Sequence, residues 1–273
     1  MTESSTASDS GQPQSPSFDT GIPQTARIWN YWLGGKDNFA VDRQVGDQVR
    51  EAFPKIVENA RADREFLVRA VRYLAGEAGI RQFLDIGTGL PTANNTHEVA
   101  QSVAPDSRIV YVDNDPLVLV HARALLTSKP EGVTDYVEGD LREPEKILRE
   151  AARTLDFSQP VALMLMGILG HISDDEQATS IVQRLLAGLP SGSYFTCYDG
   201  SDTSPEVVEA ARIWNLSASP TYHLRSPEKI ASFFQGLELV EPGVVSVSQW
   251  RPEPVSDELP AEIDQYCGVG RKP

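Results

Sequence analysis

The sequence predicts an α/β fold in which one mostly parallel sheet is covered by helices on both faces. From about residue 81 onward, short apolar runs alternate with stretches of helical periodicity, which is the pattern of strand–helix–strand units. Runs such as Val161–Met166 are apolar throughout, as expected of strands that are buried on both faces. A chain of 273 residues is long enough to bury such a core without a disulfide or a metal ion to hold it together.

Three helices are expected before the sheet begins. Pro23 marks the start of the first and Gly34-Gly35 its end, and the next two are expected at about 40–52 and 59–75. Strands at 82–86, 108–112, 133–138, 161–166 and 192–198 then alternate with helices at 95–103, 117–128, 144–155 and 173–189. Helices at 204–217 and 226–235 and strands at 237–240, 244–247 and 265–270 complete the prediction. Ser173, with Glu176 three residues later, is typical of a helix capping box.

This order divides the chain into three parts. Residues 1–19 are rich in Ser, Thr, Gln and Pro and poor in apolar side chains, so we expect a disordered tail. Residues 20–79 are predicted to form a helical N-terminal extension that acts as a lid. Residues 80–273 are predicted to form a Rossmann-like ligand-binding domain.

The composition disfavours several kinds of partner. The chain has 24 Lys and Arg against 39 Asp and Glu, a net charge of −15, so we expect no nucleic-acid or anionic-membrane surface. The two cysteines, Cys197 and Cys267, are too few for a disulfide framework or a four-thiolate zinc site, and no metal site is expected. Without a secretory signal or a membrane-spanning apolar run, the expected location is cytoplasmic. The sequence carries no signature of an oligomeric state.

The residues that bear on chemistry stand where the predicted strands end. Asp85-Ile86-Gly87-Thr88-Gly89 closes the first strand, Asp113 the second and Asp140 the third. Ligands of an open parallel sheet bind beyond these carboxyl ends. The glycines let the backbone turn sharply beside a ligand, and a carboxylate accepts hydrogen bonds from ribose hydroxyls or from an adenine amino group.

Two kinds of nucleotide compete for this loop. A dinucleotide pyrophosphate requires Gly-x-Gly-x-x-Gly that runs directly into a helix N-terminus. Here Thr92 takes the third glycine position, Pro91 lies within the loop, and the helix is expected to begin only near Asn95 or Thr96. The loop therefore favours an adenosine ligand without phosphates, such as S-adenosylmethionine. A nicotinamide-dependent oxidoreductase is the disfavoured alternative.

Asp85–Gly89, Asp113 and Gly139-Asp140 resemble the successive motifs of class I S-adenosylmethionine-dependent methyltransferases. More narrowly, residues 20–273 resemble an actinobacterial family of such methyltransferases. That likeness rests on ARIWNYWLGGKDNFAVDR (26–43), FLDIGTGLPT (83–92), YVDNDP (111–116), GILGHISDD (167–175) and the closing GVGRKP. The resemblance implies a seven-stranded sheet with an antiparallel last strand, and S-adenosylmethionine as the cofactor.

The resemblance also implies which residues meet each part of the cofactor. The methionine part would be lined by Asp85, Gly87 and Gly89, and the ribose held by Asp113 with Asn114 beside it. Asp140 and Leu141 would frame the adenine, and Met166 and Gly167 would back the methyl-donor region. Many small-molecule methyltransferases carry two bulky polar residues where this chain has Gly170-His171. His171 is the candidate general base; the alternative is a histidine packed in a loop.

The aromatic segment near the N-terminus is a second candidate region. Trp29, Tyr31 and Trp32 either pack against the core or form a lid that contacts the substrate. In the turn that follows, Lys36 or Asn38 is a candidate partner for the cofactor carboxylate. Tyr222 and His223 are candidates to line the same cleft.

Together these observations predict an enzyme that transfers a methyl group from S-adenosylmethionine to a small-molecule acceptor by in-line displacement. The cofactor brings the reactivity, and the protein supplies alignment and desolvation. The main alternative is a chain that binds S-adenosylmethionine without catalysing transfer, as a sensor or a partner-binding module.

Overall fold

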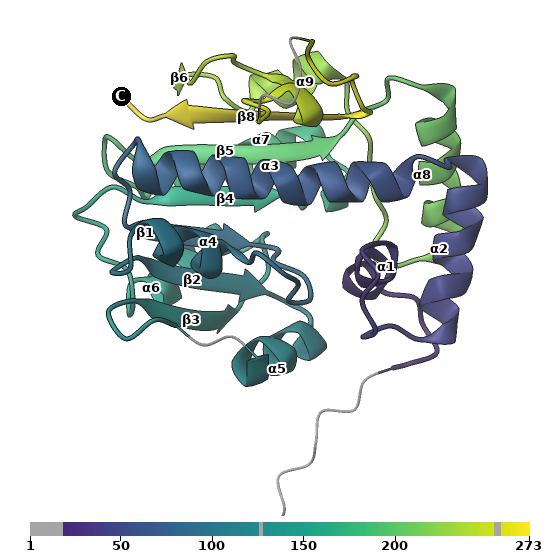
Figure 1. The fold of residues 1–273 in the computed structure, drawn as a ribbon, viewed down its shortest axis with the longest axis horizontal. Helices are drawn as coiled ribbons and strands as arrows, with labels where there is room; N and C mark the ends of the chain where they lie inside the picture. Colours follow the sequence, from purple (N-terminus) through teal and green to yellow (C-terminus); the bar gives the residue numbers. More distant parts are fainter. Residues whose placement is uncertain (1–18, 126–127, 254–257) are drawn as a thin grey trace, which may run out of the picture.

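The computed structural model describes residues 19–125, 128–253 and 258–273, and a mostly parallel sheet forms its centre (Figure 1). In this described part, eight strands are ordered β3-β2-β1-β4-β5-β8-β6, with β7 paired to β8. The first five run parallel, and β8 is antiparallel to β5. Their bounds are β1 (Gln82–Ile86), β2 (Arg108–Asp113), β3 (Val133–Glu138), β4 (Ala162–Met166), β5 (Tyr194–Gly200), β6 (Glu238–Leu239), β7 (Val245–Ser246) and β8 (Gln265–Arg271).

The antiparallel last strand is confirmed, but the sheet has one strand more than the implied seven within the described residues. The addition is the two-residue β7, which falls in the predicted strand at 244–247. One edge of β8 pairs with β5, so β6 and β7 share its other edge, one after the other. The chain reverses its strand order between β1 and β4, which is the switch point where such sheets bind ligands.

Helices cover both faces of the sheet, as predicted. On one face, α3 (Ile56–Gly76) and α4 (Thr96–Val103) bury apolar side chains such as Phe66 and Val99. On the other face, α6 (Pro144–Ala151) and α7 (Asp175–Ala187) do the same with Ile147 and Ile181. The remaining elements around the sheet are α5 (Pro116–Leu125), α9 (Pro227–Ser232) and the short 3-10 helices η1 (Leu169–His171) and η2 (Val247–Gln249). The helix predicted over 117–128 extends into residues 126–127, which lie outside the described residues.

A third group of helices lies beyond the carboxyl ends of the central strands (Figure 1). It joins α1 (Thr25–Trp32), α2 (Ala40–Ala52) and α8 (Pro205–Ser217) around a separate apolar cluster that includes Trp32 and Trp214. The buried side chains of Arg27 and Asp42 pair at 2.9 Å and tie α1 to the start of α2. A β-bridge between Gln24 and Ser219 ties the N-terminal segment to the loop after α8.

Two details at the boundaries differ from the prediction or extend it. The capping box expected at Ser173 is wrong, because Asp174 caps α7 and accepts a hydrogen bond from the Gln177 backbone at 2.6 Å. Ser and Asp cap helices equally well, so composition alone does not choose between neighbours. Residues 1–18 of the expected tail lie outside the described residues, whereas the carbonyl of Asp19 accepts a hydrogen bond from Arg27.

No helix in the described ranges is long and apolar enough to span a membrane.

Candidate functional site

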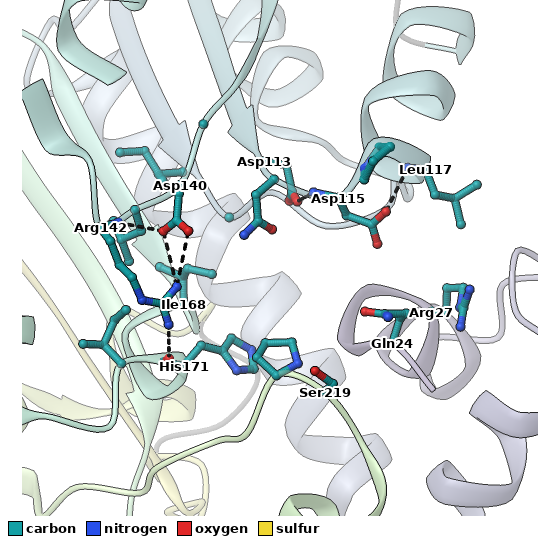
Figure 2. A pocket seen from close by; sticks show the side chains of 18 of the residues that line it. Gln24, Arg27, Asp113, Asp115, Leu117, Asp140, Arg142, Ile168, His171 and Ser219 are labelled. Carbon is teal, nitrogen blue, oxygen red and sulfur yellow. Dashed lines mark hydrogen bonds and ion pairs between the residues drawn. The ribbon is translucent and has the colours of Figure 1, made fainter. Parts of the chain in front are cut away.

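A cavity of about 430 Å³, which we call the main cavity, lies at the carboxyl ends of β1, β2 and β3. Figure 2 shows Asp113 and Asp115 along one side, Asp140, Arg142 and His171 along another, and Gln24 and Arg27 of α1 facing them across the opening. Leu141 and Ile168 supply apolar lining, and Ser219 and Pro220 come from the loop after α8. A cavity of this size is typical of small-molecule sites, which span about 300–1,000 Å³.

The glycine loop after β1 shapes one wall of this cavity. Gly87 and Gly89 have φ of 77° and 64°, in the left-handed region that glycine adopts without strain. A side chain at Gly87 would also collide with Ile168, because a Cβ there would lie 2.6 Å from it. The loop continues to Asn95, the N-cap of α4, so the predicted late start of this helix is confirmed. The helix N-terminus therefore does not follow the second glycine directly, as a pyrophosphate site requires.

Asp113 connects the glycine loop to the end of β2. One carboxylate oxygen accepts a hydrogen bond from the backbone N–H of Gly89, and the other accepts one from the backbone N–H of Asp115, each at 2.9 Å. Burial raises its pKa to about 6, and these two backbone donors oppose the rise. Asn114, beside it, is exposed and lines the cavity. The carboxylate predicted to hold a ribose therefore stands in the cavity wall.

Asp140 occupies the corresponding position after β3. Its carboxylate accepts from the Arg142 backbone at 2.8 Å and pairs with the Arg142 guanidinium at 3.3 Å. Arg142 also donates to the carbonyl of His171 at 3.3 Å, which links the ends of β3 and β4 (Figure 2). The sequence analysis did not single out Arg142; its place two residues after a strand-end carboxylate is the signal that was available.

Two smaller cavities lie along the glycine loop and share lining residues with the main one. The loop cavity, about 170 Å³, shares Gly87, Asp113 and His171 with the main cavity and adds Met166, Gly167 and Trp29. The inner cavity, about 60 Å³, is lined by Asp85, Gly89, Asp63 and Arg64 among others. The structure therefore brings Asp85, Gly87, Gly89, Met166 and Gly167 together around two cavities that share lining residues.

Two buried carboxyl groups face the inner cavity. Asp85 accepts a hydrogen bond from the Thr96 hydroxyl at 2.6 Å, and burial raises its pKa to about 6. Asp63 of α3 is 1% exposed, and neither of its oxygens has a hydrogen-bond partner among the described residues. Burial raises the pKa of Asp63 well above its ordinary value, which the side chain of Gln265 partly opposes.

Asp63 and its neighbour Arg64 were not predicted as site residues, although the sequence carries a signal for Asp63. The apolar face of α3 includes Leu67, Ala70 and Leu74. Continued toward the N-terminus at helical spacing, the same face reaches Asp63 and then Asn59. Polar residues on a buried stripe are the mark of a site or of a structural network.

His171 is held by its ring and by its backbone. Its Nδ1 lies 2.8 Å from the carbonyl of Thr221, which only accepts, so Nδ1 carries the proton and Nε2 is left as an acceptor. The ring meets Tyr222 edge to face at 5.1 Å. Burial lowers the pKa of His171 below the ordinary 6.5, which favours the neutral imidazole. The residue lines both the main cavity and the loop cavity.

A buried arginine positions the short helix that carries His171. Arg225 donates to the carbonyls of Leu169 and Ile172 on either side of it. The same guanidinium pairs with Asp199 at 3.3 Å, at the end of β5. The Tyr222 hydroxyl donates to Asp199 and accepts from the Gly200 backbone. These contacts fix the loop after β4 against the end of β5.

The remaining candidates fall into two groups. Trp29, Trp32 and Tyr222 line a fourth cavity, of about 70 Å³, which we call the aromatic pocket. The other candidates, Tyr31, Lys36, Asn38 and His223, line none of these four cavities. Tyr31 donates a hydrogen bond to Asp47, and Asn38 donates hydrogen bonds to Asn30 and Gly35. Lys36 and His223 are exposed. Their suggested contacts with cofactor or substrate stay predictions.

The strand order, the late helix and the strand-end carboxylates define an α/β protein built to bind a nucleoside rather than a dinucleotide. The chain belongs to the S-adenosyl methyltransferase family, whose family model matches residues 11–273. It is accordingly an S-adenosylmethionine-dependent methyltransferase, with S-adenosylmethionine as its cofactor.

Two solved structures are similar over nearly the whole chain. A DUF574 family protein from Streptomyces avermitilis is 47% identical, with a TM-score of 0.89 over 93% of this chain and 99% of that one. A Thermobifida fusca protein provisionally assigned as a methyltransferase is 46% identical, with a TM-score of 0.86 over 92% and 95%. No curated protein matches the sequence. None of these findings supports the nicotinamide-dependent alternative.

Proposed function

We propose that this chain transfers the methyl group of S-adenosylmethionine to a small-molecule acceptor, with the cofactor's adenosine in the main cavity. The observation that carries this proposal is the pair of carboxylates at the ends of β2 and β3. Asp113 and Asp140 both line that cavity. Carboxylates only accept hydrogen bonds, so they match the hydroxyls of a ribose and the amino group of an adenine. In this arrangement Asn114 lies beside the ribose and Leu141 beside the adenine.

The inner cavity supports a place for the methionine end. Asp63 and Arg64 are adjacent on α3 and both line it, and a bound ammonium group would favour the ionised form of the Asp63 carboxyl. The buried oxygens of Asp63 and Nε of Arg64 have no hydrogen-bond partners among the described residues. A zwitterionic amino acid supplies both missing partners, because its ammonium pairs with the carboxylate and its carboxylate with the guanidinium. Asp85 and the backbone of Gly87–Gly89 complete the lining.

Held by Asp113, Asp140 and Asp63, the cofactor would supply an electrophilic methyl carbon on a sulfonium, and its sulfur would keep both electrons of the broken bond when the acceptor's lone pair formed the new one. The chain contributes alignment and exclusion of water. α1 and the Ser219-Pro220 loop face the strand ends across the cavity. Nε2 of His171 is the atom placed to take a proton from a hydroxyl or amine acceptor, since Nδ1 is already bonded to Thr221.

The cavities also support a small acceptor. The spaces beside the glycine loop measure about 170 Å³ and 60 Å³, and part of that volume must hold the methionine end. A polymer chain needs an open groove, whereas a small molecule needs only an enclosed pocket of this scale. The net charge of −15 also disfavours a nucleic-acid acceptor.

Calorimetric titration with S-adenosylhomocysteine and NADH tests the cofactor site without knowledge of the acceptor. Wild-type protein is expected to bind S-adenosylhomocysteine and to prefer it over NADH. Asp113→Asn is expected to weaken that binding about tenfold or more, because a lost charge-assisted hydrogen bond costs about 1.5–3 kcal/mol.

The matched control is Asp106→Asn, an exposed carboxylate that precedes β2 at the opposite end of the strand. It is expected to leave the affinity unchanged. Failure of S-adenosylhomocysteine to bind, tighter binding of NADH, or equal effects of the two substitutions would contradict the proposed site.

A further inference from the structure

The aromatic pocket lies outside the space needed for the cofactor. Its walls come from α1, α2 and α8, and they include Trp29, Trp32, Phe53, Ala210 and Trp214. Its lining is apolar except near Asn59 of α3, Asp264 and Gln265, which stand beside Gly200 at the end of β5. The pocket is therefore at the same end of the sheet as the main cavity.

Two buried carboxamides of this pocket, those of Asn59 and Gln265, have polar atoms without hydrogen-bond partners among the described residues. Asn59 is 1% exposed, and neither its amide nitrogen nor its oxygen has a hydrogen-bond partner among the described residues. Gln265 is 6% exposed, and its side-chain oxygen is likewise unpaired there. Each buried polar group left unsatisfied costs about 1–3 kcal/mol of stability. A carboxamide that faces an apolar pocket without a partner therefore presents one donor and one acceptor to a ligand.

Three observations relate this pocket to the proposed methionine end. Trp29 lines both the aromatic pocket and the loop cavity, so it is the wall between them. Asn59 precedes Asp63 by one turn of α3, and side chains four residues apart share a helix face. Gln265, which lines the pocket, also influences the carboxyl of Asp63. The pocket thus borders the place where the methyl group would be presented.

We propose that the aromatic pocket binds the methyl acceptor, and that the acceptor is a small aromatic molecule with a hydrogen-bonding substituent. One edge of the ring packs among the tryptophans, the substituent pairs with Asn59 and Gln265, and the atom to be methylated extends past Trp29 into the loop cavity. A dry cavity of about 150 Å³ accepts benzene. At about 70 Å³ this pocket accepts the edge of one ring. This inference rests on the proposed function.

Phenol and toluene are suitable probes because they share a ring and differ in the hydrogen-bonding group. Three of the four tryptophans of the chain line the pocket, so their indole N–H signals in NMR spectra report occupancy. With S-adenosylhomocysteine bound, phenol is expected to shift the signals of Trp29, Trp32 and Trp214 and to leave that of Trp250 unchanged. Trp250 is packed against Phe66 under α3, away from the pocket.

A pair of substitutions on α8 tests the location. Ala210→Phe fills the pocket and is expected to weaken phenol binding about tenfold or more, a change of about 1.4 kcal/mol. Val208→Phe adds the same bulk at a position that is 47% exposed on the same helix. It is expected to change neither phenol nor S-adenosylhomocysteine binding. Equal phenol affinity in the two variants would overturn the assignment of the pocket.

A third variant tests the hydrogen-bonding substituent. Asn59→Leu keeps the approximate shape of the side chain and removes its donor and acceptor. It is expected to abolish the preference for phenol over toluene, about two- to tenfold for one hydrogen bond, and to raise the melting temperature of the unliganded protein. An unchanged preference would contradict the role of Asn59.

S-adenosylhomocysteine binding to every variant separates the two proposals. If wild-type protein does not bind it, the proposed function fails. If it binds but phenol leaves the three indole signals unchanged, only the acceptor pocket fails. A nuclear Overhauser contact between the methyl protons of S-adenosylmethionine and bound phenol is expected; its absence would show that the pocket does not face the methyl donor.

Discussion

Asp63 is the residue whose surroundings most clearly require a ligand. It is a buried carboxyl whose oxygens have no hydrogen bond of normal geometry among the described residues, although the nearby Gln265 side chain lowers its pKa, and it lines the inner cavity beside the glycine loop. If Asp63 pairs with the cofactor's ammonium, Asp63→Asn must weaken the binding of S-adenosylhomocysteine, which carries an amino-acid group. The substitution must leave the binding of 5′-methylthioadenosine unchanged, because that ligand lacks the amino-acid group. The expected loss is about tenfold or more, measured calorimetrically for both ligands.

Glu65→Gln provides the control for this comparison, because Glu65 lies on the same helix and its side chain is 72% exposed. It is expected to leave both affinities unchanged. An equal loss for the two ligands in Asp63→Asn would mean that the substitution acts on the adenosine site or on the fold, and would contradict the pairing.

His171 has a predicted protonation state that can be measured directly. Burial disfavours the imidazolium, so its pKa lies below 6.5 and the ring is neutral at pH 7. Because Nδ1 donates to Thr221, the neutral form is the Nδ1-protonated tautomer. NMR titration of ring carbon and nitrogen signals, assigned with His171→Gln, is expected to show both properties. A pKa at or above 6.5, or an Nε2-protonated ring, would remove His171 as the proton acceptor.

A base with this pKa has a consequence for methyl transfer. The unprotonated form is required, so the rate is expected to rise with pH through the lowered pKa of His171 and to level off by about pH 7. Once an acceptor is known, the pH dependence of the rate can be measured in wild-type protein and in His171→Gln. The variant is expected to lose the rise in rate with pH.

At the scale of elements, the ion pair between Arg27 and Asp42 holds the N-terminal helices in place. Both side chains are at most 2% exposed, and Asp42 also accepts from the Gln24 and Phe39 backbones. Asp42→Ala leaves a buried guanidinium without its carboxylate, which costs about 3–5 kcal/mol. We expect hydrogen exchange in α1 and α2 to accelerate while the sheet remains protected.

Glu209→Gln gives the contrasting case. Glu209 and Arg212 form an ion pair on the surface of α8, with both side chains about half exposed. Exposed ion pairs contribute little to stability, so Glu209→Gln is expected to leave hydrogen exchange in α8 unchanged. If Asp42→Ala behaved like Glu209→Gln, the buried pair would not be what anchors α1.

The elements themselves were largely predictable because their signals are local. The continuous apolar strand at 161–166 and the helix at 40–52 appear close to where periodicity placed them. The error at Ser173 and the two-residue β7 are boundary effects, decided by tertiary contacts that outweigh small differences in local preference. α3 shows a larger effect, because a helix assigned to the extension covers one face of the sheet.

At the scale of the whole molecule, part of the site follows from topology. Asp85, Asp113 and Asp140 could be predicted because parallel strands bring their carboxyl ends to one edge. The placement of Asn59 and Gln265 in one pocket could not be predicted, because about 200 residues of intervening chain separate them. No local pattern joins a helix before the sheet to its last strand.

The most direct test of the whole account is a crystal structure of the chain with S-adenosylhomocysteine bound. The account predicts the ribose hydroxyls at Asp113, the adenine amino group toward Asp140, and the ammonium at Asp63. The aromatic pocket would stay free of the cofactor. Adenosine bound outside the main cavity, or an amino-acid end that points away from Asp63, would contradict it.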